Sequence, residues 1–411
     1  MIPLEIGEAQ TIDGVMVTSI RIRSHEKTFN CGFVYFPDSV NIGDQTNPPS
    51  DSNLRTLSLN IDNLANEIED SILISQMEEI IKFIQTTCPE VATFQDLPFK
   101  ADSAYSKKLI KELTDRGYIV IVQVYKTSVS TDAKFKSKDS TLMTILDARS
   151  KGFELKHLGI MPGHQIYSET GANSIYIWDR SKDSEDTNLE VGLGLTLLAV
   201  AMVNGKLVVI GNHIGLPVTS IDDRLDTACE AALAVRELAL DYCSADEDVI
   251  CVLQGDFTPL GKDLSQIRDD EQFGLVSSII SRSRNRFKNI HEIALLAKRS
   301  FNPIGLVCAN YSVDNSLPTN YRLHENPNLS GVQEELVRGL IICHRDAKIL
   351  SFVIDSDIAT NHGALWSCIS NIKRKQLMVE ASNYEPKSNV FQKFGITQKS
   401  RRKPSTDFQS F

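Results

Sequence analysis

Residues 54–62, with the sequence LRTLSLNID, constrain the rest of the chain most strongly. Apolar and polar residues alternate here as in a buried strand, with Leu57 and Leu59 on one side and hydroxyl residues on the other. Side chains two positions apart on a strand point the same way. The segment therefore presents an amide, Asn60, and a carboxylate, Asp62, at a single place as it ends.

Four later apolar runs also end in polar residues that can bind a metal ion or a phosphate. They end in Gln95 and Asp96, in Asn212 and His213, in the run Gly255, Asp256, Phe257 and Thr258, and in Asn361 and His362. Carboxylates and amides that converge at strand ends suit a hard cation such as Mg²⁺, which takes one or two carboxylates, water and substrate phosphate. Histidines beside such acids suit phosphoryl chemistry, in which an acid activates water and charge develops on the phosphate. A single histidine after a strand is more often structural, so the indication comes from the whole series.

The apolar periodicity predicts three long helices among many short strands. The helices cover residues 64–87, 105–116 and 220–242. The strands cover residues 54–62, 91–97, 118–125, 140–147, 153–160, 173–179, 193–203, 206–214, 248–257, 336–344, 348–355 and 363–370. Residues 259–330 are typical of loops and short helices. A strand–helix–strand pattern at two places within antiparallel runs predicts an α/β fold, a sandwich of two mixed, mainly antiparallel sheets with helices outside.

The chain has 411 residues, enough for one large domain with appendages or for two domains. We expect an N-terminal arm or hairpin with a linker over residues 1–52, a main domain over residues 53–383 and a basic flexible tail over residues 384–411. From Lys387 onward six basic residues against one acid give this stretch +5, so the chain's net charge of −10 leaves −15 for the residues before it. A body this acidic is not typical of a general nucleic-acid binder, but it could hold a local basic groove or an acidic cation site.

The compartment is indicated by the cysteines and by the tail. Eight scattered cysteines with no CxxC pair predict buried free thiols in a reducing compartment. Residues 399–403, KSRRK, are either a nuclear-localisation or nucleic-acid-contact patch or part of a disordered, solvated tail. No apolar run reaches the ~20 residues of a membrane span. We expect an intracellular protein, nuclear or cytoplasmic, without a membrane partner, and the oligomeric state is left open.

The series LNID, FQDL, GNHI, QGDFT and TNHGAL resembles the motifs of the endonuclease/exonuclease/phosphatase superfamily. That superfamily has a WNID-like motif, a Q-E pair, a T-H pair, GDxN and a terminal SDH. The resemblance covers residues 53–371 and is closest to the 5′-tyrosyl-DNA phosphodiesterase group, through NID, a Gly-rich strand before the histidine and Arg224 in the following helix. It implies a four-layer α/β sandwich and a Mg²⁺-dependent phosphodiesterase, with Mn²⁺ as the alternative metal.

The resemblance also implies a role in the reaction for each of the polar residues at the strand ends. Asn60 would hold the water-activating acid and the phosphate, and Asp256 would be that acid. His213 would bind the scissile phosphate, and His362 would stabilise the charge that develops on it. The implied catalytic set is therefore Asn60, His213, Asp256 and His362. The implied metal ligands are Asp96, Asp62 and Asp256, and the implied substrate contacts are Asp62, Thr258 and Arg224.

The chain departs from the family motifs at five substituted positions, and the Arg that often follows GDTN in the tyrosyl branch is absent, with Leu260 and Gly261 there instead. Asp96 replaces a Glu, which shortens the reach of the carboxylate by about one methylene and can loosen a contact whose position matters at the ångström scale. The other departures are Thr258 for Asn, Asn361 for Asp, Val337 for Asp and Leu59 for Trp. An imidazole that no acid orients is a poorer catalyst.

Two main hypotheses follow from these departures. The chain is either a divergent Mg²⁺-dependent phosphodiesterase or a protein that keeps the fold without the chemistry and serves as a binding or scaffold protein. The substrate of the enzyme would be a phosphate ester such as a 5′-tyrosyl or other 5′-blocked DNA end. A third hypothesis, a sphingomyelinase- or inositol-phosphatase-like enzyme that hydrolyses small phosphate esters, shares the same fold.

Overall fold

The computed structural model of the protein describes most of the chain. The described residues are 1–24, 27–37, 53–61, 70–99, 103–131, 134–149, 152–163, 174–178, 188–192, 194–215, 221–244, 247–257, 305–311, 320–323, 333–336, 339–355 and 364–377. The three predicted helices are present as α1 (Asp70–Thr87), α2 (Ala104–Asp115) and α3 (Ile221–Tyr242). A short helix, α6 (Arg374–Leu377), follows the last strand.

Among the described residues, the larger of the two main sheets has twelve strands. Its main order is β2 (Glu5–Ile6), β4 (Val15–Ser24), β5 (Lys27–Phe36), β8 (Tyr118–Thr131), β9 (Lys134–Asp147), β7 (Val91–Gln95), β6 (Asn53–Asn60), β21 (Ala364–Ser370) and β20 (Ile349–Asp355). Three further strands pair at its side, namely β3 (Gln10–Ile12), β11 (Ser174–Trp178) and β12 (Asn188–Gly192).

The smaller sheet has eight strands. Its order is β1 (Ile2–Pro3), β10 (Glu154–Pro162), β13 (Gly194–Val203), β14 (Lys206–Gly215), β15 (Asp248–Asp256), β19 (Gly339–His344) and β16 (Leu306–Cys308), with β22 (Ile372–Lys373) paired to β15. A separate two-stranded sheet consists of β17 (Asn320–Leu323) and β18 (Gln333–Leu336).

Each of the two main sheets contains one parallel pair among its described strand pairs. In the larger sheet β6 and β7 are parallel, and in the smaller sheet β14 and β15 are parallel. Parallel neighbours need a crossover connection, usually a helix, and α1 and α3 lie in the two connections. These are the two strand–helix–strand units that the sequence predicts within antiparallel surroundings.

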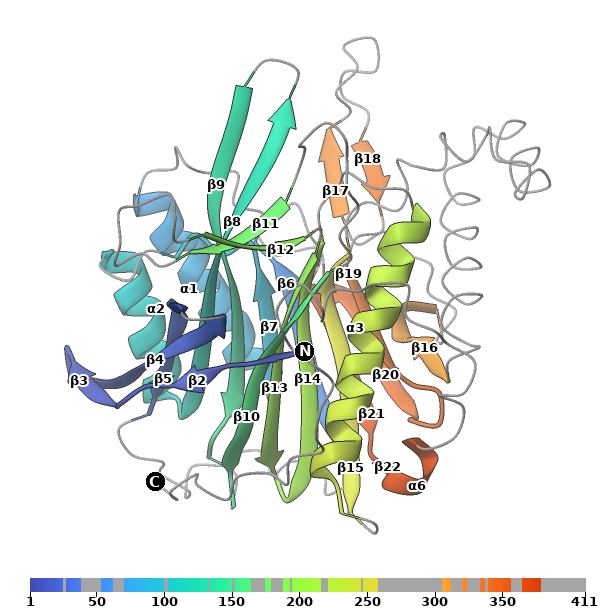
Figure 1. The fold of residues 1–411 in the computed structure, drawn as a ribbon. Helices are drawn as coiled ribbons and strands as arrows, with labels where there is room; N and C mark the ends of the chain where they lie inside the picture. The colour runs from blue at the N-terminus through green and yellow to red at the C-terminus, as the bar shows by residue number, and fades with distance from the viewer. Residues whose placement is uncertain are drawn as a thin grey trace, which may run out of the picture.

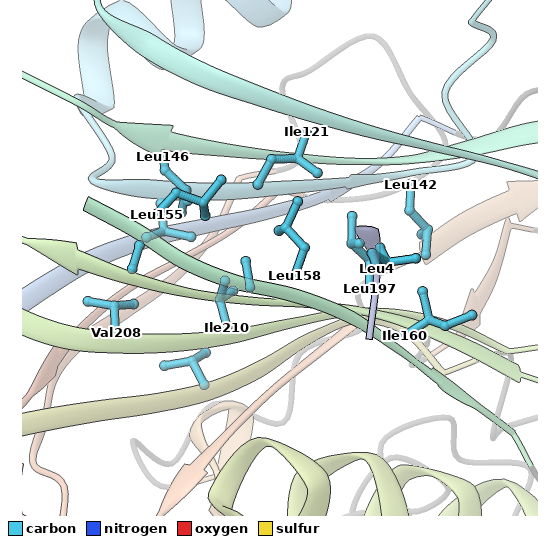
Figure 2. Packing of buried hydrophobic residues seen from close by; sticks show 14 of the residues in the cluster. Leu4, Ile121, Leu142, Leu146, Leu155, Leu158, Ile160, Leu197, Val208 and Ile210 are labelled. Atoms are coloured by element: carbon cyan, nitrogen blue, oxygen red, sulfur yellow. The ribbon is translucent and has the colours of Figure 1, made fainter. Parts of the chain in front are cut away.

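Three hydrophobic clusters separate four layers. One packs α1 and α2 against the larger sheet, one fills the space between the two sheets, and one packs α3 against the smaller sheet. In Figure 1, α1 and α2 lie on one side of the sheets and α3 lies on the other. Figure 2 shows the middle cluster, in which Ile121 of the larger sheet faces Leu158 of the smaller sheet and Leu142 of the larger sheet faces Leu197. The predicted fold class, a four-layer α/β sandwich of two mixed sheets flanked by helices, is confirmed.

The N-terminal residues belong to both sheets. Strand β1 pairs with β10 of the smaller sheet, and β2 pairs with β4 of the larger sheet. The β4–β5 hairpin, one of the two alternatives that the sequence leaves open for this region, joins the body because β5 pairs with β8. The domain boundary placed at residue 52 stays a prediction. The second boundary and the basic tail over residues 384–411 lie outside the described residues.

Two expectations about the rest of the chain have definite outcomes. Residues 259–330 were expected to contain loops and short helices only, but β16 and β17 are strands. They have three and four residues, which is too short for an alternating pattern to be recognised in the sequence. The predicted cysteine thiols are confirmed: all eight lie in the described residues, none of them forms a disulfide, and six are buried. Among the described helices, none has the length and apolar character to cross a membrane.

The interface between the two main sheets contains buried amides as well as apolar side chains. Gln254 of the smaller sheet donates from Nε2 to the Leu57 carbonyl at 2.6 Å and to Thr93 Oγ1 at 2.9 Å. Its Oε1 accepts a hydrogen bond from Thr56 Oγ1 at 2.5 Å. Buried amides need such partners, because an unpaired polar group in a protein interior costs free energy.

A second amide pair lies beside the first. Gln95 Nε2 of the larger sheet donates to Asn212 Oδ1 of the smaller sheet at 2.8 Å. Asn212 Nδ2 donates in turn to the Met143 carbonyl at 2.9 Å, and Gln95 also contacts Thr93 Oγ1 at 3.2 Å. We call these side chains the inter-sheet amide network, which comprises Gln95, Asn212 and Gln254 with the hydroxyls of Thr56, Ser58 and Thr93. All six are buried, so the network fixes how the two sheets lie on each other.

We predict that Gln254→Ala lowers the free energy of unfolding by roughly 3 kcal/mol, because it removes three hydrogen bonds and leaves buried partners unsatisfied. The matched control is Gln10→Ala at an exposed position of β3, which is expected to change stability by less than about 0.5 kcal/mol. Urea unfolding of both variants and the wild type measures the difference. Equal effects of the two substitutions would show that the network does not stabilise the sandwich.

Candidate functional site

The candidate site lies where both parallel strand pairs end. Asn60 is paired in register with Gln95 at the end of β6 and β7, and Ile214 is paired with Asp256 at the end of β14 and β15. The strands of a parallel pair bring their carboxyl ends to the same edge of a sheet. The two edges meet, because side chains from one sheet bond directly to side chains from the other.

Asn60 makes the contact that joins the two edges. Its Nδ2 donates to Asp256 Oδ2 at 2.5 Å and lies 3.4 Å from Asp96 Oδ2. An amide nitrogen carries two hydrogens, one for each carboxylate. Asn60 and Asp256 are 5% and 3% exposed, so their hydrogen bond is shielded from water. The structure therefore brings Asn60, Asp96 and Asp256 together from three different strand ends.

Asp96 is held in an unusual backbone conformation as β7 ends. Its φ is +53°, in the left-handed region that few non-glycine residues occupy, although Asp does so more readily than most. Residues held in such sparsely populated regions cluster at functional sites. Tyr125 donates from its hydroxyl to Asp96 Oδ1 at 2.8 Å. Burial, and secondarily the charge of Asp96, raises the pKa of the Tyr125 phenol well above its usual value.

His213 lies on β14 between its partners on two neighbouring strands. It is paired with Thr196 of β13 and with Gly255 of β15. Its Nδ1 is 2.8 Å from Thr196 Oγ1, and its ring stacks on Phe257 with centroids 4.6 Å apart. Burial lowers the pKa of His213 to about 3. The imidazole is therefore neutral near pH 7 and is held at a fixed angle by these contacts.

Gly255 allows β14 and β15 to approach closely beside the site. Its φ of +150° lies in a region that L side chains rarely adopt. A Cβ atom at this position would lie 2.1 Å from the His213 carbonyl oxygen. The absence of a side chain at Gly255 thus permits the spacing that places Asp256 beside the His213 strand.

Four of the predicted site residues cannot be placed. Asp62, Thr258 and His362 lie outside the described residues. Arg224 belongs to α3, but its side chain also lies outside the described part. The convergence of the complete predicted set stays a prediction.

The donor chemistry of the described carboxylates fits a hard cation. Asp96 and Asp256 offer only oxygen donors, which Mg²⁺ prefers, and Mg²⁺ commonly binds through one or two carboxylates and keeps several waters. Within the described ranges, no three His, Cys, Asp or Glu side chains form a group that could hold a metal ion. The two carboxylates that contact Asn60 therefore have the donor type that a hard cation takes, but they do not by themselves make up a metal-binding group.

Three residues with a part in the site do not stand out in the sequence. Gln254 lies two positions before Asp256 on the same strand face, so strand periodicity could have found it. Tyr125 lies on β8, beyond α2 and on a strand that does not pair with β7, so finding its contact with Asp96 requires the sheet order. Thr196 lies on β13, which directly precedes β14 in the chain. The two-residue turn Asn204-Gly205 between these strands is a local hairpin signal that could have given the register of Thr196 with His213.

Comparisons with known proteins give structural similarity only. No protein-family model matches the chain, and no curated protein matches it significantly. Truncated Caenorhabditis elegans TDP2 is 13% identical, with a TM-score of 0.41, covering 77% of this chain and 97% of that one. D. rerio TDP2 complexed with single-strand DNA product is 12% identical, with a TM-score of 0.42, covering 78% and 99%.

A third similar structure is an endonuclease/exonuclease/phosphatase family protein from Bacteroides thetaiotaomicron. It is 12% identical, with a TM-score of 0.44, and the match covers 77% of this chain and 95% of that one. The family in its name is the one that the sequence motifs resemble. At this level of identity and of TM-score, similarity assigns neither an activity nor a substrate to the chain.

We predict that His213 makes the protein less stable in mild acid. The unfolded chain binds a proton at His213 near pH 6.5, whereas the folded chain resists protonation down to about pH 3. The free energy of unfolding should therefore fall by up to ~1.4 kcal/mol per pH unit as the pH drops between these values. Denaturant unfolding at about pH 4.5 and 5.5, inside this range, and at about pH 7, above it, compares the wild type with His213→Gln. The slope of the unfolding free energy against pH should be smaller in the variant, by the amount that corresponds to the uptake of about one proton on unfolding. Identical slopes in the variant and the wild type would contradict a neutral imidazole in the folded chain.

We predict that Gly255→Ala destabilises the protein by roughly 3 kcal/mol or more, because the new methyl group overlaps the backbone of His213. Gly205→Ala is the control: Gly205 also has a positive φ, +71°, but nothing lies within 4 Å of its added Cβ. It should cost only the backbone term of about 1 kcal/mol. Urea unfolding midpoints measure both variants. Equal losses of stability in the two variants would show that β14 and β15 can accommodate a side chain at position 255.

Proposed function

We propose that the chain is a divergent Mg²⁺-dependent phosphodiesterase that hydrolyses a phosphate ester by in-line attack of water. The hydrogen bond from Asn60 Nδ2 to Asp256 Oδ2 carries this proposal. It fixes a shielded carboxylate at the point where two strand pairs from different sheets end. A general base must be held within hydrogen-bond reach of the water that it activates, and this contact supplies the fixed position.

Asp256 and Asn60 have complementary parts in the proposed reaction. Asp256, as a carboxylate, accepts a proton from the attacking water. Asn60 cannot exchange a proton at neutral pH, so its amide acts by orienting the Asp256 carboxylate. The second hydrogen of the same amide points to Asp96, which places the base and the proposed metal ligand at a fixed separation.

His213 supports the phosphate as a neutral hydrogen-bond donor. When Thr196 donates to Nδ1, the imidazole carries its hydrogen on Nε2 and can donate it to a phosphate oxygen. A donor held in a low-dielectric site stabilises developing negative charge better than one in water. The stacked Phe257 ring limits rotation of the imidazole.

The remaining roles complete the proposal. Asp96, Asp62 and Asp256 would hold the divalent cation, Mg²⁺ or Mn²⁺, which neutralises charge on the phosphate when bound. Thr258 and Arg224 would contact the substrate, and His362 would stabilise the developing charge. The proposed substrate is a 5′-tyrosyl or other 5′-blocked DNA end in a nuclear or cytoplasmic setting.

One observation favours the alternative, a binding or scaffold protein without catalysis. The Asn60 amide reaches both carboxylates through their Oδ2 atoms, so these two oxygens face a hydrogen-bond donor in the arrangement described. A cation that bridged Asp96 and Asp256 through the same oxygens would have to displace it. Under this alternative, the three residues form a structural polar cluster that joins the sheets.

We predict that Asp256→Asn lowers Mg²⁺-dependent turnover of thymidine-5′-p-nitrophenyl phosphate by ~10²–10⁴-fold, the usual contribution of a general base. Asn60→Ala should cost about 10²-fold, as expected for one positioned hydrogen-bond donor. Asp147→Asn is the matched control, since Asp147 is also buried but binds Arg149 elsewhere in the sheet. Release of p-nitrophenol with and without Mg²⁺ measures all variants, and circular dichroism confirms that each is folded.

The same assay separates the competing functions. Turnover of a 5′-tyrosyl oligonucleotide supports the DNA-end substrate. Turnover of inositol phosphates or sphingomyelin with none of the oligonucleotide would favour an enzyme for small phosphate esters. If no ester is turned over with Mg²⁺, and Asp256→Asn does not change this result, the binding or scaffold function is favoured.

A further inference from the structure

Tyr125 contacts the site from a strand that supplies none of the predicted site residues. It lies on β8, and in the larger sheet β9 separates β8 from β7, the strand that ends before Asp96. Its ring belongs to the hydrophobic cluster between the sheets. From there, the hydroxyl reaches across the neighbouring strand to Asp96 Oδ1 at 2.8 Å.

We propose that Tyr125 is a positioning residue that sets the orientation of the Asp96 carboxylate for metal binding. This inference rests on the proposed function and deepens it. Tyr125 holds Oδ1, so that Oδ2 is turned toward Asn60 and Asp256. Asp96 is thereby limited to one carboxylate orientation, in which Oδ2 is the oxygen left to bind a cation once the weaker contact of Asn60 with it is displaced.

The two contacts to Asp96 differ in strength. The bond from Tyr125 is 2.8 Å long, whereas the distance from Asn60 Nδ2 is 3.4 Å. A distance of 2.8 Å is optimal for an O–H donor, and one of 3.4 Å lies beyond the usual range for an amide. Tyr125 is therefore the stronger of these two restraints on the carboxylate, and Asn60 bonds mainly to Asp256.

The hydrogen bond from Tyr125 matters because the Asp96 side chain is one methylene shorter than that of Glu. The motif position favours Glu, and an aspartate brings its carboxylate to the same place only if its backbone and side chain are both directed there. The positive φ of Asp96 directs the backbone, and the Tyr125 hydroxyl directs the carboxylate. Misplacement of a reacting group by about 1 Å can cost ~10²-fold in rate, so loss of either restraint should be measurable.

Tyr125→Phe tests the inference, and Tyr118→Phe is its matched control. Both tyrosines lie on β8, both are buried, and both donate one hydrogen bond, Tyr118 to the Pro89 carbonyl at 3.0 Å. Each substitution removes a hydroxyl and keeps the ring. We expect Y125F to weaken Mn²⁺ binding by roughly 3- to 10-fold and to lower kcat about 10-fold with little change in KM, the result for an interaction that acts on the transition state. We expect Y118F to change neither quantity.

A double-mutant cycle distinguishes positioning from a general packing role. Mn²⁺ binding is measured by electron paramagnetic resonance on the full chain without substrate, and turnover is measured with the nitrophenyl ester. In the Asp96→Asn background, Y125F should have no further effect on either quantity, because its action passes through the Asp96 carboxylate. An equal effect of Y125F with and without Asp96→Asn would overturn the inference.

The outcomes separate this inference from the proposed function. If Asp96→Asn itself leaves Mn²⁺ binding and turnover unchanged, the proposed function fails. If Asp96→Asn abolishes both while Y125F changes neither, the proposed function stands and Tyr125 has no positioning role.

Asp96→Glu tests the same restraint with Tyr125 in place, in case Y125F does not fold. The added methylene moves the carboxylate by about 1 Å, so it cannot keep both the phenol bond and its place beside Asn60. We expect weaker Mn²⁺ binding and slower turnover despite the conserved charge. Mn²⁺ binding as tight as in the wild type would contradict the inference.

Discussion

The inter-sheet amide network sets the position of one sheet on the other, and the site depends on that position. Hydrophobic packing between sheets is non-directional, so the apolar cluster between them tolerates small sliding movements. The bonds from Gln254 to Leu57 and from Gln95 to Asn212 are directional and do not tolerate it. Two positions after Gln254 on the same strand face comes Asp256, and its bond to Asn60 needs the alignment that the network provides. The network and the site are thus successive rows of one polar interface.

The two crossover helices explain why these strands carry polar residues at buried positions. A helix on the outer face of each parallel pair takes up the apolar side chains there, as α1 does for Leu57 and Leu59. The opposite face of the same strand then meets the other sheet, and Thr56 finds a hydrogen-bond partner in Gln254. Each central strand therefore has two buried faces. The face toward the other sheet is apolar along part of its length, as at Val208 and Ile210 of β14, and becomes polar toward the carboxyl end, as at Asn212. Because both parallel pairs end at the same edge of the sandwich, the polar faces terminate together there.

Much of this arrangement follows from local pattern, and the rest depends on contacts between distant segments. Alternation in residues 54–62 separates Leu57 and Leu59 from the polar face, and the two strand–helix–strand units predict the layers. The contact of Tyr125 with Asp96 could not be predicted, because it depends on the order of the strands in the sheet. The pairing of Thr196 with His213 is local by comparison, because the two-residue turn Asn204-Gly205 joins their strands and sets the register. The pairing of residues 2–3 with one sheet and residues 5–6 with the other is likewise non-local, since strands of two residues carry no periodic signal.

The environment of Asp96 shows why a change in a motif has to be judged together with its neighbours. A shorter acid loses reach, and considered alone it indicates a weaker metal contact. In the folded chain the backbone turn at Asp96 and the phenol of Tyr125 both act on the same side chain. A left-handed residue costs of order 1–3 kcal/mol, and such a conformation persists only where surrounding contacts over-determine it. The phenol bond and the adjacent network are contacts of this kind, and they also direct the carboxylate toward Asn60. The shorter side chain, the strained backbone and the Tyr125 hydroxyl thus act on one carboxylate together. Their joint effect on the site is not the sum of the effects that each would have alone.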